Sequence, residues 1–289
     1  MSRHLVISVA GGGALGIGPL AFLCKVEQLL EKSVADVAQA FAGTSTGAII
    51  AAGLAEGYSA HDLYDLYRGN LKKIFKKYGI IQRLKPKCPT YDNTNLKRVL
   101  QENFPGKIGE WKKPVFIPTT HMNGTSVEKV WDLGDKDVDK WFAVLTSTAA
   151  PTYFDCVYDD KKNCYIDGGM WSNSPVDVLN AGLIKSGWSN YKVLDLETGM
   201  DTPNSESGNK TLVGWAEYIF SDWVARSGKS GEYEVKSIIG EKNFMAVRPY
   251  VKSKPKMDDI SDKTLDKVVE LWEGYFYANK DAIKAWLKR

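Results

Sequence analysis

The stretch LVISVAGGGALGIGPLAFL, residues 5–23, contains an apolar run, a glycine-rich turn and the start of a second apolar segment. This order predicts a strand, a tight turn and a helix, with the helix over residues 16–32. The pattern repeats with a predicted strand at 37–43 and a predicted helix at 47–56. Alternation of this kind is typical of a mostly parallel sheet with helices on both faces. Further strands are expected at PVFIPTTH (114–121), KNCYIDGG (162–169) and YKVLDLE (191–197).

The size and composition of the chain limit its class. Its 289 residues, of which 44% are hydrophobic, are enough for one substantial core. The net charge of +3 is too small to imply a nucleic-acid partner. The sequence has no run of 18 apolar residues and no secretory pattern at its N-terminus, so we expect a cytoplasmic protein without a membrane span.

We expect one domain over residues 1–289, with a motif-bearing core at 5–200 and a helical C-terminal part at 211–289. Between them, DTPNSESGNK (201–210) is rich in polar turn residues, which predicts a loop. Apolar residues near the C-terminus recur at helical spacing and predict a stripe that packs on the core, with membrane contact or dimerisation as the alternative. They are Leu265, Val268, Val269, Trp272, Phe276, Ile283 and Trp286.

Residues 68–98 carry ten basic residues and a single acid, Asp92. Within LKKIFKKYGII the apolar residues fall on one helical face and the lysines on the other. This pattern fits a basic amphipathic helix at an anionic membrane surface, and it equally fits a solvated helix whose apolar side packs on the core. The apolar residues are Leu71, Ile74, Phe75 and Tyr78.

Residues 43–47, GTSTG, form a G-x-S-x-G sequence after a predicted strand and before a predicted helix. A serine on such a tight turn has strained backbone angles, and its neighbours two positions away crowd together, so Gly43 and Gly47 must both be glycine. The helix that begins behind Ser45 directs its positive end at the reacting centre and favours an anion there. The context therefore predicts that Ser45 is a nucleophile.

A serine nucleophile needs a base, and histidine is the usual one. The chain contains only His4, His61 and His121. In α/β-hydrolases the histidine comes near the end of the chain, but here none follows His121. His121 ends a predicted strand and is the only histidine worth testing; a structural role is expected for each of the three.

The other candidate base is Asp167 in CYIDGGMWSNSPV, at the end of a predicted strand and before Gly168 and Gly169. The two glycines allow close approach of backbone to backbone. A carboxylate held near Ser45 would take its proton directly, and partial burial would raise the basicity of the carboxylate. An ordinary Asp-Gly turn is the alternative interpretation.

The glycine turn, G-x-G-x-x-G at residues 11–16, also matches the dinucleotide-binding fingerprint. That interpretation requires an acid at the end of the second strand. Asp36 lies 20 residues after the last glycine but precedes the second strand, which ends instead at the Ser45 turn. The N–H groups of Gly12 and Gly13 would instead point at the oxygen that becomes negative when Ser45 attacks an ester.

These motifs, in this order, resemble those of the patatin-like phospholipase family. GGGALGIGPLAFL resembles its oxyanion loop and GTSTG its nucleophile turn, while PTYDNTNLKRVLQENF, STAAPTYF, DGGMWSNSP and VLDLETG are similar to later family segments. The resemblance spans about residues 5–200. It implies a three-layer α/β/α fold with a mostly parallel sheet. It also implies a carboxylic ester hydrolase that cleaves lipid acyl esters with a Ser–Asp dyad, without metal or cofactor.

The resemblance implies a role for each matching residue. Ser45 would be the nucleophile and Asp167 the base, and the oxyanion loop would consist of Gly11, Gly12 and Gly13. Further motif residues are Gly16, Gly43, Gly47, Gly168, Gly169 and Asn173. The implied partner is a phospholipid or another acyl-ester lipid, reached by transient peripheral contact with a membrane surface, and not a nucleic acid.

The chain departs from the family pattern at two positions. Many members carry Asp where this chain has Ala10, and Arg or Lys where it has Leu15. We expect Leu15 to make the surroundings of the loop more favourable to an apolar substrate. An acyl transferase and a nonenzymatic lipid-binding protein are the alternatives on the same fold. Carrier-linked transferases usually have His immediately before the serine, where this chain has Thr44.

Overall fold

A mixed central β-sheet organises the chain in a computed structural model that describes residues 3–79, 89–123, 127–201, 224–251 and 255–289. The strand order is β5-β6-β3-β2-β1-β7-β9, and β4 also pairs with β3. Neighbours from β3 to β9 along this order run parallel, whereas β4, β5 and β6 are antiparallel to their partners. The strands are β1 (His4–Val9), β2 (Ala38–Gly43), β3 (Val115–His121), β4 (Glu128–Trp131), β5 (Val157–Tyr158), β6 (Cys164–Asp167), β7 (Tyr191–Leu196) and β9 (Phe244–Val247), with β8 (Met200–Asp201) and β10 (Tyr250–Val251) forming a separate pair.

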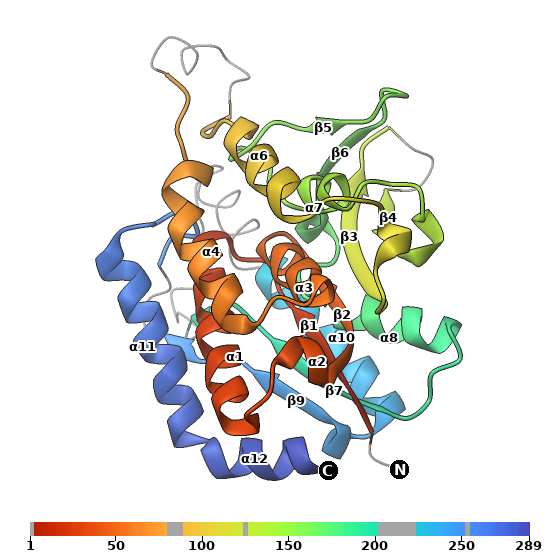
Figure 1. Cartoon of the computed structure of the whole chain (residues 1–289), viewed down its shortest axis with the longest axis vertical. Helices are drawn as coiled ribbons and strands as arrows, with labels where there is room; N and C mark the ends of the chain where they lie inside the picture. Colours follow the sequence, from red (N-terminus) through yellow and green to blue (C-terminus); the bar gives the residue numbers. More distant parts are fainter. Residues whose placement is uncertain (1–2, 80–88, 124–126, 202–223, 252–254) are drawn as a thin grey trace, which may run out of the picture.

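Helices cover both faces of the sheet, so the expected three-layer α/β/α fold is confirmed (Figure 1). Helices α8 and α10 pack on one face, and most of the other helices pack on the opposite face. Central strands are apolar on both sides, as in β1, where Val6 enters one core and Ile7 the other. The helices are α1 (Ile17–Leu30), α2 (Val34–Val37), α3 (Thr46–Glu56), α4 (Ala60–Ile74), α6 (Thr94–Asn103), α7 (Lys140–Ser147), α8 (Val176–Lys185), α10 (Val224–Ile239), α11 (Asp262–Ala278) and α12 (Lys280–Lys288).

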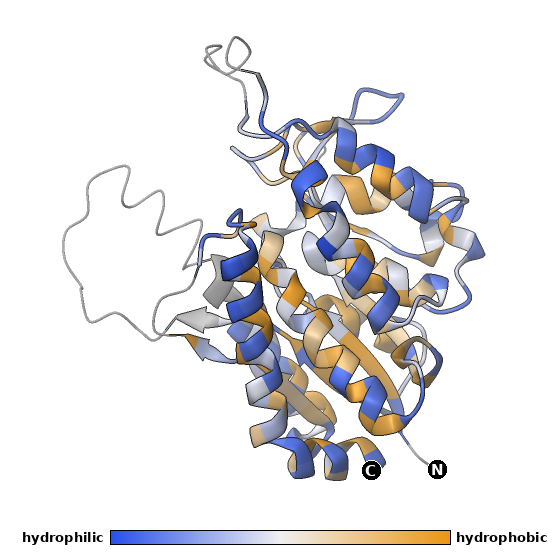
Figure 2. Cartoon of the chain, turned by 60° about the vertical axis from the view of Figure 1, so that its left-hand side comes forward, coloured by the Kyte–Doolittle hydropathy of each residue, from blue (hydrophilic) through white to orange (hydrophobic). Residues whose placement is uncertain are grey.

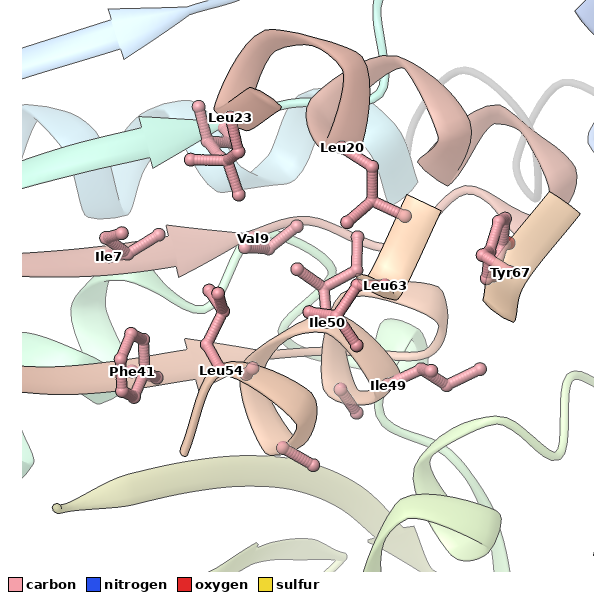
Figure 3. Close-up of a cluster of buried hydrophobic side chains, with 14 of the residues drawn as sticks. Ile7, Val9, Leu20, Leu23, Phe41, Ile49, Ile50, Leu54, Leu63 and Tyr67 are labelled. Atoms are coloured by element: carbon pink, nitrogen blue, oxygen red, sulfur yellow. The ribbon is translucent and has the colours of Figure 1, made fainter. Parts of the chain in front are cut away.

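The larger core lies between the sheet and the helices that follow β1 and β2. Ile7 and Val9 of β1 and Phe41 of β2 pack with Leu20 of α1 and Ile50 of α3 (Figure 3). All five are fully buried, and burying a side chain of this size stabilises a fold by roughly 1.5–3 kcal/mol. Hydrophobic residues dominate the central strands and hydrophilic residues the outer helix faces (Figure 2). This core fixes the carboxyl ends of β1 and β2, from which the glycine turn and the Ser45 turn begin.

Helix α1 belongs to this core. Among the described residues, Gly13–Leu30 is the one helical stretch long and apolar enough to span a membrane, with a mean hydropathy of 1.3 over 18 residues. A buried core helix meets the same criterion, and 67% of this stretch is buried inside the fold. We therefore interpret it as a core helix.

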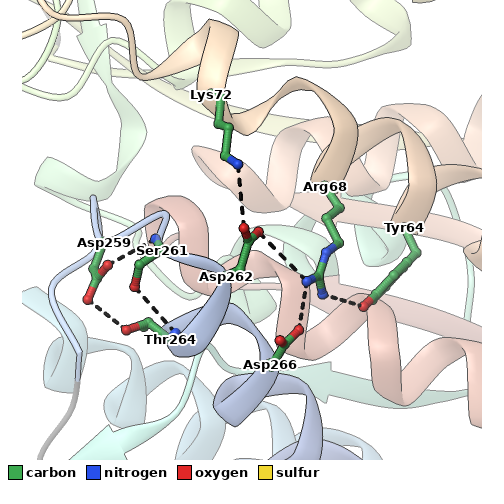
Figure 4. A network of polar contacts seen from close by, with 8 residues as sticks. All are labelled: Tyr64, Arg68, Lys72, Asp259, Ser261, Asp262, Thr264 and Asp266. Carbon is green, nitrogen blue, oxygen red and sulfur yellow. Dashed lines mark hydrogen bonds and ion pairs between the residues drawn. The ribbon is translucent and has the colours of Figure 1, made fainter.

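The basic segment packs its apolar face on the core. Leu71 and Ile74 of α4 are buried, so the interpretation as a packed helix is correct for this face. Part of the basic face is neutralised by α11, because Nη2 of Arg68 lies 2.6 Å from Oδ1 of Asp266 (Figure 4). Residues 80–88 lie outside the described part of the segment. The lysines that stay exposed on α4 and just after it are Lys72, Lys73, Lys76 and Lys77.

The C-terminal part agrees with the predicted stripe but also contains the strands β9 and β10. The stripe of α11 and α12, including Trp272 and Trp286, is buried against the core. Phe244–Val247, however, form β9, which pairs in parallel with β7 and extends the sheet. The part at 211–289 thus contains short strands beside its helices, which the sequence analysis did not predict because two to four residues are too few to show a strand pattern. The predicted loop at 201–210 lies almost entirely outside the described residues.

Candidate active site

Ser45 lies on the turn that joins the carboxyl end of β2 to α3. Its angles, φ 56° and ψ −124°, are rare for a residue with a side chain. Such a conformation costs on the order of 1–3 kcal/mol and persists where the surroundings impose it. Here the N–H of Ser45 donates to Oγ of Ser147 (3.0 Å), and the N–H of Thr44 donates to the carbonyl oxygen of Val9 (3.2 Å). The strained turn expected for a nucleophile is present.

Glycines allow the close approaches that this turn requires. A Cβ on Gly43 would lie 2.0 Å from the carbonyl oxygen of Gly47, and one on Gly47 would lie 2.0 Å from that of Val9. A Cβ on Gly16 would lie 2.0 Å from Cγ2 of Thr46. The glycine turn after β1 is thereby packed directly against the Ser45 turn.

Asp167 ends β6, and the side chain of Ser45 lies close enough to its carboxylate to favour the charged form. Oδ1 of Asp167 accepts the N–H of Gly169 (2.7 Å), and the residue is only 5% exposed. Burial raises the pKa of this carboxyl from 3.8 to about 6, although the Gly169 N–H and the Ser45 side chain favour the charged form. Gly168 lets the turn approach β3, since a Cβ there would lie 2.2 Å from the carbonyl oxygen of Pro118. A buried carboxylate of raised pKa beside a serine would be suited to accept the hydroxyl proton.

The histidines have other surroundings. The ring of His121, at the end of β3, stacks on that of Tyr165 with 4.9 Å between centroids. His4 and His61 are exposed, and His4 begins β1, at the end of the strand away from the glycine turn. In the described part of the chain, the carboxyl whose pKa the Ser45 side chain affects is that of Asp167.

The glycine turn presents two N–H groups that have no recorded partner among the described residues, those of Gly12 and Gly13. The N–H of Gly11 donates instead to the carbonyl oxygen of Asn173 (2.9 Å), so Gly11 belongs to the loop without supplying a free donor. A Cβ on Gly11 would lie 3.1 Å from that of Ser45, which shows how closely the loop approaches the nucleophile. An oxygen that becomes negative beside Ser45 would be able to accept hydrogen bonds from these two N–H groups.

Side chains from other elements hold the carbonyl groups of the same turn. The carbonyl oxygen of Gly13 accepts hydrogen bonds from the hydroxyl of Tyr67 (2.5 Å) and from Oγ1 of Thr46 (2.8 Å). The carbonyl oxygen of Gly11 accepts a hydrogen bond from Oγ1 of Thr198 (2.9 Å). Our sequence reasoning gave Tyr67 and Thr198 no role. Thr198 lies within the VLDLETG motif, whereas nothing in the helical pattern distinguishes Tyr67.

Leu15 packs inside the larger core. It is 2% exposed and is one of the large, fully buried side chains of the core. The expectation that it makes the substrate environment more apolar is therefore wrong. Ala10 is fully buried as well. Asp36 lies in α2, before β2 and away from the glycine turn at the other end of the parallel strands, which agrees with the argument against a dinucleotide site.

The chain was compared with known families and proteins. The family model described as patatin-like phospholipase matches residues 7–180. A cGAMP-activated phospholipase of Pseudomonas aeruginosa is 30% identical over 182 residues, which cover 59% of this chain and 54% of that protein. An intracellular phospholipase A2 of Caenorhabditis elegans is 30% identical over 186 residues, which cover 59% of this chain and 16% of that protein.

Coverage of the relatives is partial: the chain spans about half the length of the three bacterial phospholipases that it matches. Among solved structures, VipD from Legionella pneumophila has a TM-score of 0.49 at 13% identity, with 95% of this chain and 67% of that chain covered. The family model, in contrast, matches more than half of the chain in a single block. The chain belongs to the patatin-like phospholipase family.

Proposed function

We propose that the chain is a serine acyl hydrolase of the phospholipase A or lysophospholipase type, which cleaves fatty-acyl esters of membrane lipids. The observation that carries this proposal is the closeness of the Ser45 side chain to buried Asp167, beside the N–H groups of Gly12 and Gly13, which have no recorded partner among the described residues. Acyl transfer needs these three parts: a nucleophile, a base and donors for an oxyanion. Membership of a phospholipase family supports a lipid ester as the substrate class.

In the proposed reaction, Oγ of Ser45 attacks the ester carbonyl carbon while Asp167 accepts the hydroxyl proton. The carbonyl oxygen becomes an oxyanion that accepts hydrogen bonds from Gly12 and Gly13, and one such donor is typically worth roughly 3–4 kcal/mol of barrier. Asp167 then protonates the departing alcohol, and the acyl group remains on Ser45. Water attacks this acyl-enzyme with Asp167 again as base, and the fatty acid leaves.

We also propose that the protein contacts the cytoplasmic side of a membrane through the region near the carboxyl end of α4. The hydroxyls of Tyr67 and Thr46 lie 2.7 Å apart, so α4 passes the Ser45 turn, and its last residues lie beyond this contact. Each lysine near an anionic lipid surface contributes about 1 kcal/mol of attraction. The exposed lysines of this region are Lys73, Lys76 and Lys77, together with Lys72, whose Nζ lies 3.5 Å from Oδ2 of Asp262.

Ser45→Ala and Asp167→Asn test the proposed chemistry. Both variants should fold and release no fatty acid from phosphatidylcholine–phosphatidylglycerol vesicles, as measured by mass spectrometry, while His121→Ala keeps its activity. Full activity of Asp167→Asn together with an inactive His121→Ala would overturn the dyad.

Two further measurements separate the alternatives. A fluorophosphonate probe should label the wild type and not Ser45→Ala, whereas a nonenzymatic lipid-binding protein would stay unlabelled. Product analysis with water as the sole acceptor identifies a hydrolase, because an acyl transferase would release product only when an alcohol or thiol acceptor is added.

A further inference from the structure

Thr198 lies just after β7 and is 5% exposed. Its Oγ1 donates to the carbonyl oxygen of Gly11 (2.9 Å), which Nδ2 of Asn173 also approaches at 3.5 Å. A Cβ on Gly12 would lie 2.3 Å from the same Oγ1. The hydroxyl therefore meets the turn at the peptide group that joins Gly11 to Gly12.

The carbonyl of Gly11 and the N–H of Gly12 belong to one planar peptide group. In a trans peptide they point in opposite directions, and the described chain contains no cis peptide bond. A hydrogen bond that fixes the carbonyl thus also fixes the direction of the N–H. This matters here because a peptide group between glycines has unusual rotational freedom.

We propose that Thr198 is a positioning residue that keeps the Gly12 N–H directed at the oxyanion formed on Ser45. This inference rests on the proposed function and assigns a task to the VLDLETG motif. Thr198 touches no reacting atom: it acts through the backbone of the turn. Its hydroxyl supplies the short bond to the Gly11 carbonyl, and Asn173 supplies the longer one.

Thr198→Val removes the hydroxyl while it keeps the shape of the side chain. Loss of a whole oxyanion donor lowers kcat by about 10²–10³-fold. Because Asn173 still holds the carbonyl in part, we expect kcat on a soluble nitrophenyl ester to fall about 10- to 100-fold, with KM within about twofold. Thr198→Ser, which restores the donor, should recover most of the loss.

Thr146→Val is the control for a lost buried hydroxyl away from the glycine turn: Oγ1 of Thr146 donates to the carbonyl oxygen of Ala143 (2.8 Å) and accepts the indole N–H of Trp131 (2.9 Å). Because it also leaves the Trp131 N–H without its acceptor, it should lower the unfolding temperature at least as much as Thr198→Val, without the fall in kcat. An equal fall in kcat in this control, a kcat of Thr198→Val within twofold of wild type, or a change confined to KM would each overturn the proposal.

A crystal structure of Thr198→Val provides a readout that does not depend on activity. The peptide group between Gly11 and Gly12 should be rotated relative to the wild type, and an unchanged direction would overturn the positioning role. Absence of both hydrolysis and Ser45 labelling in the wild type would instead refute the proposed function. The two failures can therefore be told apart.

Discussion

Replacing Asp167 with Asn should stabilise the protein at neutral and alkaline pH while it removes activity. The pKa of this buried carboxyl rises from 3.8 to about 6, which corresponds to about 3 kcal/mol at 1.36 kcal/mol per pKa unit. The folded wild type bears this cost whenever the carboxyl is ionised. Asparagine is neutral and of similar size, and its side-chain oxygen can still accept the N–H of Gly169.

The pH dependence follows from the direction of the shift. Below about pH 4 the Asp167 carboxyl is protonated in both the folded and unfolded states, so wild type and variant should have similar stability. Between about pH 4 and 6 the unfolded chain loses this proton while the folded protein keeps it, and wild-type stability falls. Above about pH 6 the difference is complete, and Asp167→Asn should be more stable by about 3 kcal/mol.

Urea unfolding followed by tryptophan fluorescence, at pH values from 4 to 8, measures this difference. Asp160→Asn, on an exposed turn, is the matched control and should change the unfolding free energy little at any pH. The reasoning is refuted if Asp167→Asn is less stable than wild type at pH 8, or if its advantage is the same at pH 4. Wild-type kcat/KM should fall as pH drops below about 6, because the base becomes protonated.

Two more variants test the backbone strain at Ser45 and the packing of α11 on the core. Because Ser45 has φ 56°, Ser45→Gly should be more stable than Ser45→Ala by about 1 kcal/mol, and equal unfolding temperatures would contradict strain at this position. Trp272 is 1% exposed on α11, so Trp272→Ala should lower the free energy of unfolding by about 3–5 kcal/mol. Lys267→Ala, on the exposed face of the same helix, should change it by less than about 0.5 kcal/mol, and a comparable loss in both variants would argue against tight packing of α11.

The Ser45 turn could be predicted from the sequence because its requirements are local. Five consecutive residues specify the approach between Gly43 and Gly47, and the strand and helix around them are long enough to recognise. The prediction that Asp167 is the base depended more on the family resemblance, since an Asp-Gly pair at a strand end is common. Its carboxylate acquires a raised pKa only through burial by the folded chain.

Other features depend on contacts between residues far apart in the sequence, which no local sequence pattern predicts. The hydroxyl of Thr198 meets a carbonyl 187 residues away in the sequence, and Tyr67 reaches the turn from the inner face of a helix. The burial of Leu15 in the core was not predicted, because a helix start that is buried on all sides has no polar face to mark its orientation. Strand β9 was missed because its four residues become recognisable only through pairing with β7.

Three features of the site each reduce stability. Ser45 holds a strained backbone, Asp167 carries a buried carboxylate, and Gly12 and Gly13 present N–H groups without a recorded partner in the described structure. Any one of them could be a local irregularity, since each costs no more than a few kcal/mol. Their meeting at the ends of β1, β2 and β6 is harder to explain by chance, because separate parts of the core must impose all three at one point. Attack by a serine, proton transfer and charge on an oxygen need these three features together, so we base the assignment on their coincidence.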